Sequence, residues 1–176
     1  RPFKFVGEAY YKQMNNIIPY EIDNVRIRYY AENSANAYAV GADFKINGEF
    51  VKGVDSWVNL GFLQVREDIQ NDGYFDYFNS DGEKIVPGFT LNNTPTDSVR
   101  REPGYIPRPT DQLINFSLFF QDYLPRYPSY QMHMTFHYGS GMPFGPPSNE
   151  RYKDTLRIPP YLRVDLGFSK QLIGED

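Results

Sequence analysis

Two histidines on one short stretch are the first candidates for chemistry. His133 and His137 stand four residues apart, which is a metal-binding spacing on a helix. The residues around them alternate between apolar and polar with a period of two, which indicates a strand. On a strand the two imidazoles lie about 13 Å apart, which is too far for them to share one ion. We therefore predict no metal site here and interpret both histidines as polar wall residues.

A second candidate is the polar segment NSDGE at 79–83, which has the composition of a calcium-binding loop. The position that should supply the first carboxylate is Tyr77, and Gly88 stands where a bidentate Glu belongs. We therefore predict an ordinary turn. No Ser/His/Asp order, nucleotide-binding glycine pattern or pair of catalytic carboxylates stands out, so we predict neither catalytic residues nor a cofactor, and no enzyme.

A third group lies in the region 68–111, which is rich in Asp, Asn, Gly and Pro. We predict that this region is irregular and forms the longest loop of the chain. A structureless loop of this length argues against a compact soluble domain, and loops commonly carry binding residues. This one combines aromatic surface with charge. We predict that six of its residues contact a cargo: Tyr74, Phe75, Tyr77, Phe78, Arg100 and Arg101.

Six strands with two-residue alternation must position these groups. The clearest pair lies within 112–138, where Leu118 and Phe136 belong to apolar faces and the intervening residues to polar ones. The predicted strands cover 3–12, 38–46, 57–67, 114–121, 131–138 and 161–169. Each has one apolar face and one polar face.

The composition is compatible with strands that cross a membrane. Aromatic residues make up 17% of the 176 residues, with 15 Tyr and 14 Phe against a single Trp. Mean hydropathy is −0.58, and no apolar run approaches the roughly 20 residues that a spanning helix needs. A spanning strand needs only every second residue to be apolar. The net charge of −4 disfavours nucleic acid as a partner, and the lack of Cys excludes disulfides and thiolate metal sites.

The connections between the predicted strands fall into two classes. The short ones carry Asn47-Gly48, extended by Lys52-Gly53, and the two prolines of 122–128. The long ones contain the polar segments 15–33, 68–111 and 139–160. Because successive connections of antiparallel strands alternate between the two ends of a sheet, all long loops are predicted at one end. This asymmetry is typical of outer-membrane barrels.

Aromatic residues are expected to form belts at the two headgroup levels of a membrane. The belt predicted near the short turns contains Phe3, Phe5, Phe44, Trp57, Phe120, Tyr130 and Phe168. The belt predicted near the long loops contains Tyr11, Tyr38, Phe136, Tyr138 and Tyr161.

Four segments resemble the late barrel strands of TonB-dependent outer-membrane receptors. They are YAVGADFKINGEFVKG at 38–53, RPTDQLINFSLFFQDYLP at 108–125, GSGMPFGPP at 139–147 and PPYLRVDLGFSK at 159–170. The likeness lies in the strand pattern and in the placement of Gly and Pro, and it covers nearly the whole chain. It says almost nothing about the cargo.

The resemblance implies an all-β, antiparallel transmembrane β-barrel of 22 strands with an N-terminal plug domain, in the outer membrane of a Gram-negative cell. It implies import of a scarce small-molecule, glycan or peptide cargo with energy from the TonB complex, and it admits a surface lipoprotein as a further partner. We expect residues 1–176 to form about six of these strands, with the plug domain and closing strands elsewhere. Six strands alone leave two unpaired edges in lipid, so the rest of the barrel must complete them.

Charged side chains are costly in contact with lipid, so we expect those on the polar faces to line the lumen. There they pair with one another or with the plug. The lumen-facing charged and polar residues are Glu8, Lys12, Asp43, Lys45, His133, His137, Arg163 and Asp165.

Two tripeptides in the long loops, DSV at 97–99 and DTL at 154–156, resemble an acceptor pattern for O-linked glycans in some Gram-negative bacteria. Ser98 and Thr155 are therefore candidate glycosylation sites.

Two other architectures fit the same strands. A secreted or periplasmic β-sandwich that binds glycans through Tyr-rich loops buries Phe116, Phe120, Met134 and Leu166 against a second sheet, whereas a barrel exposes them to lipid. A porin or assembly-type barrel without a plug differs only in sequence outside this chain.

Overall fold

The computed structural model describes residues 3–23, 26–29, 31–144 and 155–172. These residues form strands, turns and irregular connections. Among them, no helix has the length and apolar character needed to cross a membrane.

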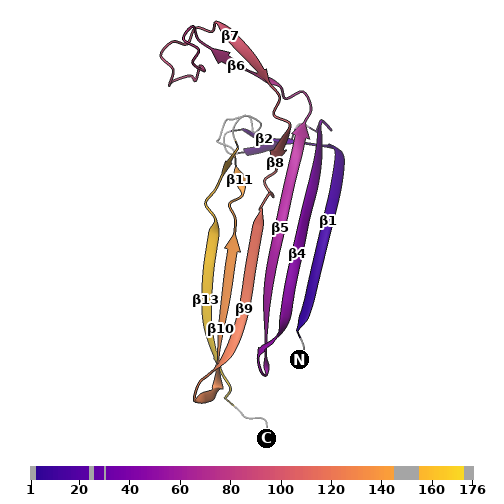
Figure 1. Ribbon diagram of the computed structural model, residues 1–176, viewed down its shortest axis with the longest axis vertical. Coiled ribbons are helices and arrows are strands. Elements are labelled where there is room, and N and C mark those ends of the chain that lie inside the picture. The colour runs from indigo at the N-terminus through magenta and orange to yellow at the C-terminus, as the bar shows by residue number, and fades with distance from the viewer. Residues whose placement is uncertain (1–2, 24–25, 30, 145–154, 173–176) are drawn as a thin grey trace.

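The six predicted strands are all present in one antiparallel sheet (Figure 1). They are β1 (Lys4–Ile17), β4 (Ala35–Val51), β5 (Val54–Ile69), β9 (Ile114–Leu124), β10 (Tyr127–Gly139) and β13 (Tyr161–Lys170). The strands lie side by side in chain order, and the short β8 (Tyr105–Pro107) pairs with the end of β5. In the described part of the chain, β1 and β13 each have a neighbour on one side only, so the sheet is open.

The register places the apolar stripes of all six strands on one face. Across β4, β5 and β9, Phe44 pairs with Leu60 and Leu60 with Phe116. The same row continues through Tyr138 to Leu162. Side chains alternate between the two faces of a pleated strand. One aligned row of paired residues therefore determines the face on which every other residue of the six strands lies. The predicted division of each strand into an apolar and a polar face is confirmed.

No second layer of described residues covers the apolar face. Phe5 is 63% exposed, and Leu166 and Phe168 are each 65% exposed. The remaining sheets are three two-stranded hairpins, and Figure 1 shows them at one end of the long strands. Apart from glycine and proline, the buried apolar residues of the described chain are Tyr20, Ala35, Ala37, Val54, Val65 and Ile106.

The long connections lie at one end of the sheet and the short turns at the other (Figure 1), as predicted. The long connections are, however, more regular than predicted. They contain the hairpins β2–β3 (Tyr20–Asp23 and Arg26–Tyr29), β6–β7 (Tyr74–Phe78 and Asp97–Arg101) and β11–β12 (Pro143–Phe144 and Leu156–Arg157). The prediction that 68–111 is irregular throughout is therefore wrong.

The two short turns are tighter than predicted. Strand β4 continues past Asn47-Gly48, with a register shift, and reverses at Lys52-Gly53, where Gly53 has a φ of 90°. Glycine adopts this left-handed conformation without steric penalty. Strands β9 and β10 run to Leu124 and from Tyr127, so the second turn consists of Pro125 and Arg126. Proline cannot donate to the ladder and sets φ for the turn.

The structure places the aromatic residues of the two predicted belts on their strands and requires two corrections. Near the long loops the rings of Tyr11 and Tyr38 stack at 6.4 Å, and Tyr105 of β8 joins them at 5.2 Å from Tyr38. Trp57 pairs with Phe119 and lies on the polar face. Tyr161 pairs with Gly139 and lies on the polar face too. Their placement in outward belts was wrong because each stands one residue out of step with its strand's apolar stripe.

Candidate functional site

The six predicted cargo residues all lie on the β6–β7 hairpin, which projects beyond the long-loop end of the sheet (Figure 1). The pairing divides them between two faces. Phe75 pairs with Arg100 and Tyr77 pairs with Ser98 on one face, which we call the open face. Tyr74, Phe78 and Arg101 belong to the other face. The sequence could not make this division because the hairpin itself was not predicted.

The open face presents two exposed aromatic rings to solvent. Phe75 and Tyr77 are 51% and 50% exposed, and their ring centroids lie 6.5 Å apart. The guanidinium of Arg100 pairs with Glu102 at 2.5 Å. The two neighbouring rings can stack against the apolar side of a cargo. The Tyr77 hydroxyl can form a hydrogen bond with the edge of that cargo.

The other face holds a structural ion-pair centre at Asp76. Its carboxylate is buried and lies 2.7 Å from the Lys84 ammonium and 3.2 Å from the Arg101 guanidinium. The guanidinium of Arg101 therefore holds β7 to β6 through Asp76. The hydrogen bond from Lys84 lowers the pKa of Asp76, assisted by Arg101 and opposed by burial.

Acidification is expected to loosen this hairpin. Because the folded-state pKa of Asp76 is below its unfolded value of about 3.9, the ion pairs stabilise the hairpin fully above that value. Their contribution is lost as pH falls from there through the folded pKa. Amide exchange of β6 and β7, corrected for the intrinsic rate, should stay constant from pH 7 to about 4.5 and accelerate below about 4. Asp76→Asn should make this protection weaker and insensitive to pH, and an unchanged pH response in the variant would contradict the assignment.

The segment 79–83 is the predicted turn. The Asn79 side-chain Oδ1 accepts hydrogen bonds from the backbone N–H groups of Asp81 and Glu83, at 3.0 Å and 2.9 Å. Its Nδ2 donates to the carbonyl of Asn92 at 3.2 Å. A buried Asn thus closes the turn and ties it to the far side of the loop.

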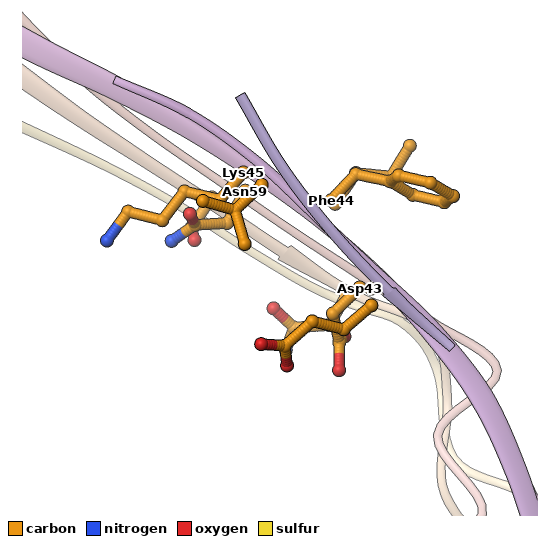
Figure 2. A pocket seen from close by; sticks show the side chains of 10 residues that line it. Asp43, Phe44, Lys45 and Asn59 are labelled. Atoms are coloured by element: carbon orange, nitrogen blue, oxygen red, sulfur yellow. The ribbon is translucent and has the colours of Figure 1, made fainter. Parts of the chain in front are cut away.

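The eight residues predicted to line a lumen share the polar face of the main sheet. Figure 2 shows Asp43, Lys45 and Asn59 on one side of the strands and Phe44 on the other. A cavity of about 410 Å³ lies against Asp43, Lys45 and Asn59 on this side.

The polar face holds both an ion pair and a pair of like charges. The guanidinium of Arg163 lies 2.8 Å from the Asp165 carboxylate, so that one pair fulfils the predicted pairing. Glu8 and Asp43 stand directly opposite each other on β1 and β4. Like charges in this position destabilise a sheet. The polar face therefore favours a cationic or hydrogen-bonding group beside these two carboxylates.

Glycines make room for the larger side chains of the polar face. Gly41 is the direct partner of Tyr10, and Gly167 of His133. In both cases a Cβ on the glycine would collide with the opposite ring. The histidines thus have separate partners, since His137 stands opposite Arg163. Large polar side chains can therefore lie flat along the sheet.

Sequence reasoning missed a buried charged cluster at the long-loop end. Asp111 is fully buried, and its Oδ1 accepts a hydrogen bond of 2.7 Å from the backbone N–H of Val65. Its Oδ2 pairs with Arg157, whose Nη1 donates to the carbonyls of Asp111 and Gly141 at 2.9 Å each. Asp111 lies 46 residues from each of Val65 and Arg157, so no local motif indicates the cluster. It fastens two long connections to each other and to strand β5.

Both candidate glycosylation sites are exposed. Ser98 lies on β7 beside Tyr77, on the open face. Thr155 immediately precedes β12. Asp154 of its tripeptide lies outside the described residues, as do residues 145–147 of the segment 139–147.

Comparison with known proteins finds no matching family model, no matching curated sequence and no matching solved structure. Among the described residues, no group of three or more His, Asp or Glu side chains could hold a metal ion.

Proposed function

We propose that this chain is part of the barrel wall of a TonB-dependent receptor in the outer membrane. The observation that carries the proposal is the six-stranded sheet with one continuous, uncovered apolar face and one polar face. In water such a face is an aggregation hazard. Against acyl chains the same face needs no cover, because lipid replaces a second protein layer.

Strand length and strand edges support the same proposal. Each of the six strands has 10 residues or more, and a tilted strand needs about 9–11 residues to cross the hydrocarbon core. The long edges of β1 and β13 require partners in lipid, because unpaired backbone groups there cost several kcal/mol each. Further strands of the same barrel are the partners that we propose.

A water-soluble sandwich is less well supported. Its second sheet must pack about 10 Å from the first, on the apolar face. The described residues place no sheet there. The polar face, by contrast, suits a lumen that holds a plug domain and water.

Within this proposal the β6–β7 hairpin captures cargo above the membrane, and the TonB complex supplies the energy for import. The open face is the contacting surface, since its rings are exposed whereas the other face is engaged with Asp76. Cargo thus meets Phe75 and Tyr77 before it enters the lumen.

The double variant Phe75→Ala/Tyr77→Ala is expected to reduce cargo uptake about tenfold, because exposed aromatic anchors dominate the energy of a contact surface. The full-length variant is expressed in its own host, and growth is compared with the wild type on chelated metals, glycans and peptides as limiting nutrients. Both proteins should appear in the outer-membrane fraction in equal amounts.

The matched control is Phe89→Ala/Leu91→Ala, which removes two exposed apolar side chains from the same loop but not from the open face. The control should leave uptake unchanged. Equal uptake by wild type and the Phe75/Tyr77 variant contradicts the role of the open face. Recovery of the wild type in the soluble fraction contradicts the membrane assignment itself.

A further inference from the structure

A second cavity lies on the polar face at the long-loop end of the sheet, separate from the open face of β6–β7. Its volume is about 570 Å³, within the range of pockets that hold small organic molecules. The β2–β3 hairpin lies across this end of β1, β4 and β5 (Figure 1) and contributes part of the lining. The cavity thus has a floor of sheet and a wall of hairpin.

The floor of the cavity is apolar although it belongs to the polar face. Ala39, Leu63 and Val65 replace the charged residues found lower on the same face. Tyr20 and Tyr29 of the hairpin form the wall, and their ring centroids lie 6.2 Å apart. Tyr20 is buried, so the hairpin is held against the sheet by an aromatic anchor. An apolar floor with aromatic walls suits a flat or branched hydrocarbon body.

Two cationic side chains line the cavity, and they differ in whether a carboxylate of the protein already pairs with them. Arg108 pairs with the buried carboxylate of Glu67 at 3.4 Å. Lys12 makes no ion pair with any residue that the structure describes, and its side chain is exposed at the cavity rim. Lys12 is therefore a solvent-exposed cation that an anion at the cavity rim can reach.

We propose that this cavity binds a small organic anion, with its hydrocarbon body on the apolar floor and its anionic group beside Lys12. A neutral saccharide fits less well, because it makes no use of Lys12 and covers an apolar floor with hydroxyl groups. The inference rests on the proposed function in one respect, namely that the polar face is reached by water and cargo.

The test compares two probes that share one ring system and differ in charge. The full-length protein, purified in detergent, is titrated with 2-naphthoate and with neutral 2-naphthamide by equilibrium dialysis, and a detergent-only blank is subtracted. The wild type should prefer 2-naphthoate by up to about fivefold, the upper end of the effect of one partly exposed ion pair. Lys12→Gln should abolish this preference, and Tyr29→Ala should weaken the binding of both probes.

Lys45→Gln is the control, because Lys45 lies on the same face but lines the other cavity. It should keep the full preference for 2-naphthoate. Equal binding of the two probes to the wild type overturns the proposal, as does a preference that survives Lys12→Gln. Displacement of 2-naphthoate by maltose would overturn the anionic class. The preference between the two probes is measured on purified protein, whereas the membrane assignment is tested by cell fractionation. Either proposal can therefore be contradicted without the other.

Discussion

Leu118→Arg is expected to reduce the free energy of unfolding of the full-length barrel in lipid by about 2–4 kcal/mol, the usual effect of a cation near the bilayer midplane. Leu118 lies near the middle of β9, between Val58 and Phe136 on the apolar face. An arginine there must bury its charge in hydrocarbon or distort the bilayer to reach water. The measurement is urea unfolding of the protein reconstituted in bilayers.

The neighbouring residue provides the control. Ser117 pairs with Asn59 and His137 on the polar face, so Ser117→Arg places the same side chain in the lumen. Its effect should be much smaller, because a charge in a polar lumen keeps its contact with water. If the two arginines destabilised the protein equally, the apolar face would not be in contact with lipid.

Arg157→Met is expected to destabilise the long-loop end of the sheet by about 3 kcal/mol, because it leaves the fully buried charge of Asp111 without its partner. The remaining hydrogen bond from the Val65 amide compensates only part of that charge. Methionine keeps the length of the side chain, so the loss reports on charge more than on packing. The loss is measured as faster amide exchange at Val65 and in β11.

The double variant Asp111→Asn/Arg157→Met distinguishes charge from shape. A carboxamide oxygen still accepts the hydrogen bond from Val65 but carries no charge, so at least half of the lost protection should return. A double variant as unstable as Arg157→Met would contradict a charge-based explanation. Unchanged amide exchange in Arg157→Met would show that the Asp111–Arg157 pair contributes nothing to stability.

The strands and their faces could be predicted from the sequence because a pleated strand imposes a period of two on every residue. The apolar stripe of β10, with Met134 and Phe136, needs no knowledge of its neighbours. Trp57 and Tyr161 were assigned to the apolar face because they are aromatic. Their odd positions place them on the polar face of their strands.

The hairpins in the long loops could not be predicted in the same way. In β2–β3 each strand has only four residues, which is too short for a two-residue alternation to be recognised. In β6–β7 the strands are separated by residues 79–96, which removes the tight-turn signal. The division of the cargo residues into two faces and the Asp111–Arg157 cluster depend on these distant pairings, so they emerge only from the three-dimensional arrangement.

The most direct test of the central claim is site-directed spin labelling along β9. The sequence has no Cys, so cysteines can be placed singly at residues 114–121 of the full-length protein in liposomes. Collision rates are then measured with oxygen, which concentrates in lipid, and with a water-soluble nickel chelate. Labels at 114, 116, 118 and 120 should collide mainly with oxygen, and those at 115, 117, 119 and 121 mainly with the chelate. Protection of the even-numbered positions from both reagents would mean that protein covers the apolar face, and would contradict the account.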